Sequence, residues 1–109
     1  MSSSRTWLYY NTMITVAVRK NSIAVSGHAQ RPEGVPAGQN IICAAVSAIT
    51  QALLDGLENI AGLAIESHVD KGMVTMQWQH MNEIGKALVD TWFLGICGIE
   101  RSYGEIRII

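Results

Sequence analysis

The sequence lacks the features that mark several common classes of protein. It has two cysteines in 109 residues, whereas small secreted domains held by disulfide bonds usually carry more. Basic residues number 8 against 9 acidic ones, so no excess of positive charge favours a nucleic-acid partner. No apolar run reaches the roughly 18 residues that span a bilayer, and the start lacks the apolar stretch of a secretory signal. We therefore expect a cytoplasmic protein that binds neither nucleic acid nor membrane.

The sequence does contain enough apolar residues for one hydrophobic core. They make up 49% of the chain, and its length is that of one domain of roughly 100–150 residues. Residues 13–109 carry the periodic patterns of secondary structure, whereas residues 1–12 carry none. We therefore predict a poorly ordered extension over 1–12 and a single domain over 13–109.

Alternation and helical periodicity divide this domain into seven elements. Alternating, β-branched segments predict strands over residues 13–20, 23–29, 63–69, 73–79 and 103–109. Apolar side chains three or four residues apart predict helices over residues 41–61 and 82–98. The order ββαββαβ is typical of an α+β domain in which a mainly antiparallel sheet is packed with two helices.

Each predicted helix has one apolar face and recognisable ends. The two faces comprise Ile42, Val46, Ile49, Leu53, Leu57 and Ile60 in the first helix, and Ile84, Leu88, Trp92 and Ile96 in the second. Asn40 suits the N-cap of the first helix, and Gly62 suits the left-handed position after its end. Residues 30–39 hold both prolines, and residues 70–72 (Asp-Lys-Gly) are typical of a hairpin, so a loop and a tight turn are expected there.

The predicted elements place a thiol near an imidazole and a hydroxyl. Cys43 falls at the third position of the first helix, where free amide groups and the helix dipole favour a thiolate, the nucleophilic form of cysteine. His28 ends the preceding strand, a position from which it could act as the base. Ser47 follows one turn after Cys43 on the same face. Cysteines in apolar helices more often serve packing, so spacing alone leaves a catalytic and a packing interpretation open.

Two blocks of sequence resemble the ribosomal-processing cysteine protease family, Prp. They are residues 26–29 (Ser-Gly-His-Ala) and residues 38–50 (Gly-Gln-Asn-Ile-Ile-Cys-Ala-Ala-Val-Ser-Ala-Ile-Thr), and the similarity runs from residue 13 to the end of the chain. The resemblance implies that Cys43 is the nucleophile and His28 the general base. Around this pair, Gly27, Asn40 and Ser47 are expected to support the site or contact the substrate.

The resemblance also implies a substrate and an assembly. The bacterial enzymes of this family remove the N-terminal extension of a large-subunit ribosomal protein, so the expected partner is a protein with a disordered tail, and the chemistry needs no metal or organic cofactor. A homodimer is implied as well, and so small a domain with so many apolar residues is not expected to bury every apolar face alone. Two alternatives stay open: a peptidase that processes a phage structural precursor, and a non-catalytic dimeric relative that binds a protein tail.

Two departures from the family pattern bear on activity. The family usually has Asp three residues before the cysteine, and here that residue is Asn40. Asparagine can cap a helix and orient an imidazole, but it cannot supply a negative charge to an imidazolium. The loop over residues 30–39 is also longer than in the family, which bears on substrate preference.

The remaining thiol and imidazoles are expected to have no role in chemistry. Cys97 lies within the second predicted helix and is expected to be a buried core thiol. His68 and His80 lack the spacing of a metal-binding motif. A zinc site formed by these histidines with His28 and Cys43 would need a convergence that nothing in the sequence predicts. No metal site is therefore expected.

Overall fold

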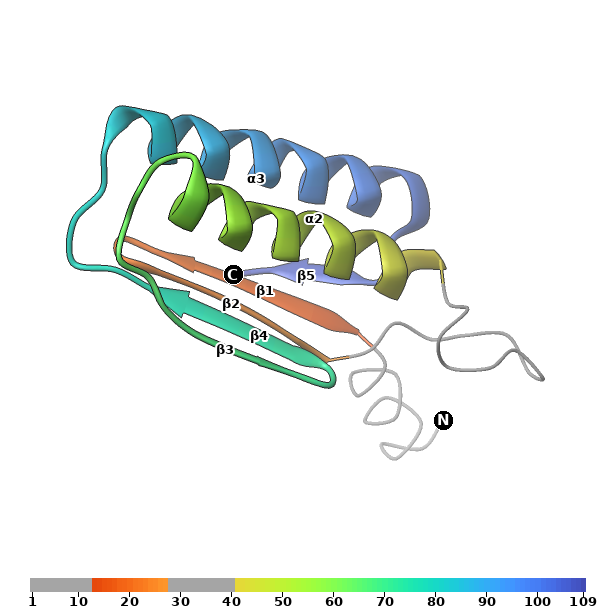
Figure 1. Cartoon of the computed structure of the whole chain (residues 1–109). Helices are drawn as coiled ribbons and strands as arrows, with labels where there is room; N and C mark the ends of the chain where they lie inside the picture. Colours follow the sequence, from red (N-terminus) through yellow and green to blue (C-terminus); the bar gives the residue numbers. More distant parts are fainter. Residues whose placement is uncertain (1–12, 28–40) are drawn as a thin grey trace, which may run out of the picture.

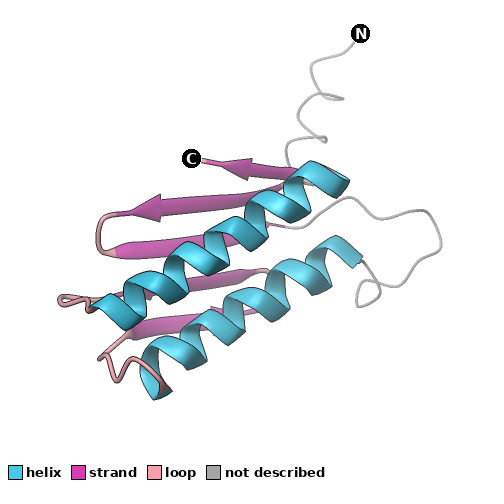
Figure 2. Cartoon of the chain, turned by 90° about the horizontal axis from the view of Figure 1, so that it is seen from above, coloured by secondary structure: helices cyan, strands magenta, loops and turns pink. Residues whose placement is uncertain are grey.

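The protein is a two-layer domain in which two helices cover one face of a five-stranded sheet (Figures 1 and 2). The computed structural model describes residues 13–27 and 41–109. Its elements are β1 (Ile14–Arg19), β2 (Ser22–Gly27), α2 (Ile41–Asn59), β3 (Glu66–Asp70), β4 (Met73–Gln77), α3 (Glu83–Tyr103) and β5 (Ile106–Ile108). The predicted α+β class and the order ββαββαβ are confirmed. The extension predicted over residues 1–12 and the loop predicted over 30–39 lie outside the described residues.

The sheet brings together strands that are far apart in the chain. Its order is β3-β4-β2-β1-β5, and every neighbouring pair is antiparallel except β1 and β5. Two tight hairpins, β1–β2 and β3–β4, lie side by side because β4 pairs with β2. This pairing places the turn of the second hairpin next to the end of β2, beneath the start of α2 (Figure 1).

The core lies between the helices and the sheet. Alternate residues of β1, β2 and β4 point into it, as the period of a strand requires. Val16, Leu57 and Ile96 have no exposed surface and come from the sheet, α2 and α3 respectively. Thr50 is a buried polar residue on α2, and its Oγ1 accepts a hydrogen bond of 3.0 Å from Nε1 of Trp92 on α3. That bond joins the two helices where both face the core.

The ends of the helices agree only in part with the sequence-based expectations. Gly62 has φ of 69°, the left-handed conformation expected after α2. Ile60 was expected on the apolar face but is 68% exposed, because α2 ends at Asn59 before reaching it. Ile84 was also expected to be buried but is 53% exposed, because the first turn of α3 presents Gly85 to the protein instead. The expectation for both isoleucines was wrong.

Other element boundaries also differ from the prediction, and the closing strand expected from Tyr103 begins only at Ile106, because α3 includes Tyr103. The second helix was expected to end at Gly98 but continues to Tyr103. Ile99 packs against the core, and this packing outweighs the poor helix propensity of the preceding glycine. The strand expected from residue 63 begins only at Glu66, because the segment from Gly62 to residue 65 connects α2 to the sheet edge.

Helix α2 is long and apolar enough to cross a membrane by length and composition, with a hydropathy of 1.5. Its buried residues nevertheless pack on the sheet and on α3, as those of a core helix do. One such helix is weak evidence of a membrane span.

Candidate active site

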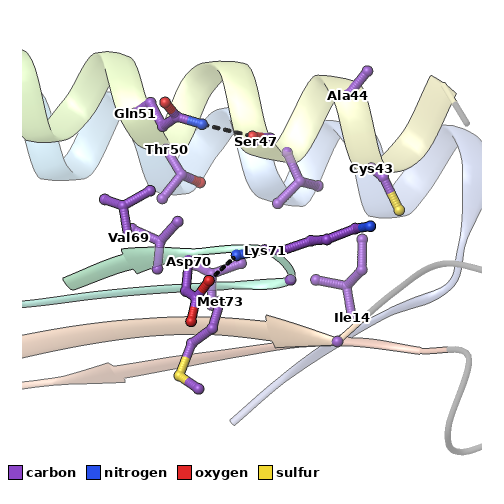
Figure 3. Close-up of a pocket in the computed structure, with 15 residues that line it drawn as sticks. Ile14, Cys43, Ala44, Ser47, Thr50, Gln51, Val69, Asp70, Lys71 and Met73 are labelled. Atoms are coloured by element: carbon purple, nitrogen blue, oxygen red, sulfur yellow. Dashed lines mark hydrogen bonds between the residues drawn. The ribbon is translucent and has the colours of Figure 1, made fainter. Parts of the chain in front are cut away.

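Cys43 lies in the first turn of α2 and faces a cavity of about 560 Å³ (Figure 3). The thiol is half-buried. Residues of β1, β2, α2 and the β3–β4 hairpin line the cavity, and most of them are apolar, including Ile14, Val25, Val46, Val69 and Val74. A thiol at a helix start can attack a carbonyl carbon placed in such a cavity, where the first amides of the helix are suited to stabilise the oxyanion.

The turn of the β3–β4 hairpin forms the wall opposite α2. Asp70 pairs with Met73, so Lys71 and Gly72 alone make the turn. Gly72 has φ of 79°, which a glycine adopts at little cost. Its carbonyl oxygen accepts a hydrogen bond of 3.0 Å from the amide of Gly27. The hairpin is thereby tied to the end of β2.

Gly27 ends β2 in a conformation that excludes a side chain. Its φ is 98°, and a Cβ at this position would collide with the carbonyl oxygen of Met13. Residue 27 therefore has to be glycine for β1 and β2 to keep their pairing up to Ile14. The residue lines the cavity, and His28 follows it in the sequence.

Ser47 lines the same cavity one turn after Cys43, as the helical spacing predicts. Its Oγ accepts a hydrogen bond of 2.8 Å from Nε2 of Gln51, one further turn along α2 (Figure 3). Because that bond uses a lone pair, the hydroxyl hydrogen of Ser47 remains able to donate to a group in the cavity. Thr50, which also lines the cavity, is held by its bond to Trp92.

The structure thus brings together Gly27, Cys43 and Ser47 of the residues singled out in the sequence. His28 and Asn40 lie outside the described residues, so the distance from the thiol to the imidazole is not part of this geometry. Cys97 was expected to be a buried core thiol, and that expectation was wrong because it is only half-buried. It follows the buried Ile96, and one residue along a helix turns the side chain by about 100° away from the buried face.

Two charged residues of the cavity wall, Asp70 and Lys71, had been interpreted only as part of a hairpin turn. The turn itself was predicted from its glycine and is confirmed. Its place beside Cys43 depends on the pairing of β4 with β2, which no local pattern shows. The presence of charged residues in a hairpin turn was the one feature of the sequence that could have suggested a role for them in a site.

The remaining histidines lie elsewhere. His68 is on the exposed edge strand β3, with Nε2 3.9 Å from Oδ2 of Asp70. His80 lines a different cavity at the other end of the sheet. Over residues 13–27 and 41–109, no three His, Cys, Asp or Glu side chains lie close enough to hold a metal ion.

Comparison with known proteins identifies the family of this chain. No curated protein sequence is significantly similar to it. A structure of the ribosomal processing protease Prp from S. aureus, with a covalently linked product peptide, superposes with a TM-score of 0.73 at 19% identity, covering 87% of this chain and 94% of that one. The protein SMU.848 from Streptococcus mutans gives a TM-score of 0.70 at 26% identity, covering 90% and 95%.

The family model provides the stronger result. It describes cysteine protease Prp and matches residues 13–107, nearly the whole of the chain. The match includes both sequence blocks that suggested the resemblance and every described helix and strand except the last residue of β5. The chain therefore belongs to the Prp family of cysteine proteases.

Proposed function

We propose that this protein is a ribosomal-processing protease that removes the N-terminal extension of a large-subunit ribosomal protein, with Cys43 as nucleophile and His28 as general base. The observation that carries the proposal is the position of Cys43, in the first turn of α2 and facing a cavity whose other side ends at Gly27. His28 follows Gly27 directly in the sequence, and Gly27 lines the same cavity as Cys43. The ribosomal processing protease Prp from S. aureus has been crystallised with a substrate peptide and with a covalently linked product peptide.

The reaction is an acyl transfer in two steps. The Cys43 thiolate attacks the carbonyl carbon of the scissile bond, and the amides at the start of α2 stabilise the oxyanion. The C–N bond breaks as the His28 imidazolium gives its proton to the leaving amine, which leaves a thioester on Cys43. Water then attacks the thioester while His28 takes a proton from it, and the thiolate is released with the second product.

The cavity favours an extended and flexible substrate. It is enclosed by α2 on one side and by the hairpin turn on the other, and its volume of about 560 Å³ suits a few residues of a peptide rather than a folded domain. Its walls are apolar at Ile14, Val25 and Val46. We therefore expect a bulky apolar or aromatic side chain close to the bond that is cut, within a disordered tail.

A cytoplasmic homodimer completes the proposal. Apolar side chains remain exposed along α3 and at the end of β5, among them Leu94 at 71% and Ile109 at 50%. Burial of such side chains between two copies favours association. Sedimentation equilibrium should give twice the mass of one chain at micromolar concentration, and a monomer at high micromolar concentration would contradict this part of the proposal.

The function is tested by incubating the purified protein with a large-subunit ribosomal protein that carries its N-terminal extension. Mass spectrometry should show a single cut that removes the extension. The Cys43→Ala and His28→Ala variants should leave the protein intact while keeping the circular dichroism spectrum of the wild type. If a phage structural precursor is cut and the ribosomal protein is not, the protease chemistry stands and the substrate assignment is wrong.

A further inference from the structure

Lys71 is the single basic residue that lines the Cys43 cavity within the described part of the chain. It belongs to a two-residue turn whose other member, Gly72, accepts a hydrogen bond from the amide of Gly27. From there its side chain runs along the cavity, and its ammonium group points toward the Cys43 thiol (Figure 3). The turn therefore presents a positive charge at the place where a substrate would be attacked.

The one acidic residue of the same wall does not neutralise this charge. Oδ1 of Asp70 accepts a hydrogen bond of 2.7 Å from the backbone amide of Lys71, and Oδ2 lies 3.9 Å from Nε2 of His68. The carboxylate lies at the strand end of the turn, away from Cys43 (Figure 3). Over residues 13–27 and 41–109, the Lys71 ammonium forms no ion pair.

We infer that Lys71 is a specificity-determining residue whose ammonium group binds an acidic side chain of the substrate, close to the bond that Cys43 attacks. The other side chains around the thiol, such as Ala44, Val46 and Ser47, are uncharged, so this one cation distinguishes an acidic from a neutral substrate residue. The low polarity of these walls strengthens an ion pair relative to one in open solvent. This inference rests on the proposed function, in which Cys43 attacks a peptide in this cavity.

Two alkylating reagents test the inference without any knowledge of the natural substrate. Iodoacetate and iodoacetamide react with the same thiolate, but only iodoacetate carries a carboxylate. The ratio of their rates at Cys43 therefore reports attraction of a carboxylate and is independent of how much thiolate is present. The measurement uses the Cys97→Ala protein, in which Cys43 is the one remaining cysteine.

In this protein, Lys71→Met should lower the ratio of iodoacetate to iodoacetamide rates by roughly fivefold at low ionic strength, and Lys71→Glu should lower it further. Lys86→Met removes an exposed lysine on α3 that does not line the cavity and should leave the ratio unchanged. Circular dichroism verifies that each variant is folded, and Lys71→Gln provides a second neutral variant. Equal ratios in the parent protein and in both neutral variants would overturn the inference.

Peptide cleavage then tests the same residue on a substrate. Matched peptides, amidated at the C-terminus, carry Glu or Gln at each position that flanks the scissile bond. The wild type should prefer Glu at one position by roughly tenfold in kcat/KM, and Lys71→Met should lose that preference. An unchanged Glu preference in Lys71→Met, or no Glu preference in the wild type at any position, would refute the inference. If the wild type cuts no peptide or ribosomal protein, the proposed function fails, and the alkylation ratio still decides whether Lys71 attracts a carboxylate.

Discussion

The two helices begin at opposite ends of the sheet, because α2 and α3 run antiparallel across it (Figure 1). At the start of α3, the side chain of Asn82 forms hydrogen bonds with backbone groups. Oδ1 of Asn82 accepts a hydrogen bond of 2.8 Å from the amide of Gly85, and its Nδ2 donates to the carbonyl oxygen of Ala61 at 2.9 Å. Glu83 adds an acidic side chain to the first turn, where the helix dipole favours it.

The start of α2 is built differently. Its first turn contains no acidic residue, and it carries Cys43 beside a cavity instead. Among the described residues, this electrostatic property of a helix start stabilises α3, whereas in α2 the proposed function assigns it to a thiolate and an oxyanion. The comparison teaches that substitutions at the two helix starts should have different consequences, one for stability and the other for chemistry.

The largest expected effect is the loss of cleavage in Cys43→Ala. Without the nucleophile, kcat/KM should fall at least about a thousandfold. The thiol is half-buried, so the free energy of unfolding should change by less than about 1 kcal/mol. Peptide hydrolysis and urea denaturation measure the two quantities. Cleavage that persists within about tenfold of the wild-type rate would assign the chemistry to another residue.

A smaller effect is expected in the reactivity of the two cysteines. Cys43 and Cys97 are both half-buried, so exposure alone predicts similar rates of alkylation. Because only Cys43 lies at a helix start, iodoacetamide should modify it at least about tenfold faster than Cys97 in the native protein. Peptide mapping by mass spectrometry gives both rates. In urea the alkylation rates of Cys43 and Cys97 should become equal, because the helix start is lost. Equal rates in the native protein would contradict a special reactivity of Cys43.

Two glycines with positive φ, one near each helix start, provide a matched pair. Gly27→Ala should cost roughly 2–3 kcal/mol, because the new methyl group meets the carbonyl oxygen of Met13 in addition to the unfavourable φ. Gly62→Ala has open space around it and should cost only about 1 kcal/mol. Thermal unfolding and peptide hydrolysis would separate them: only Gly27→Ala should also reduce kcat/KM, because it displaces the wall of the cavity. A loss of activity in Gly62→Ala would show that the start of α3 and the cavity beside the start of α2 are not independent.

The smallest effect concerns the cap of α3. Asn82→Ala should lower the free energy of unfolding by about 1 kcal/mol, because the amide of Gly85 loses its acceptor. Asn82→Asp keeps the acceptor and should recover most of this stability, although the bond to Ala61 is lost. Neither variant should alter kcat/KM. A change in kcat/KM with unchanged stability would contradict the assignment of this helix start to stability.

Much of the fold was predictable because periodicity reports burial. The spacing of Ile42, Val46, Leu53 and Leu57 predicted α2, and all four are buried. One helix boundary was wrong because a packing contact, which the local pattern does not show, decides where the helix ends. Gly98 did not end α3, because Ile99 continues to pack against the core beyond it.

The site was predictable on one side of the cavity and not on the other. Gly27, Cys43 and Ser47 were found from local sequence, since each lies within a block whose spacing and residue types are informative. Lys71 was not, because its position depends on the pairing of β4 with β2 in the middle of the sheet. A pattern that repeats every two residues predicts a strand but does not identify its neighbour.

The hydrogen bond between Trp92 and Thr50 links the fluorescence of a tryptophan to the occupancy of the cavity. Thr50 lines the cavity, and its hydroxyl oxygen holds the indole N–H at 3.0 Å in the core behind it. A molecule that enters the cavity changes the surroundings of Thr50 and with them the polarity around the indole, so the fluorescence emission of Trp92 should shift on binding. Trp78, buried at the far end of the sheet, lines a different cavity, and comparison with a Trp92→Phe variant separates the emission of Trp92 from that of Trp7 and Trp78. Occupancy of the site can therefore be followed in the unlabelled protein, before any bond is cut.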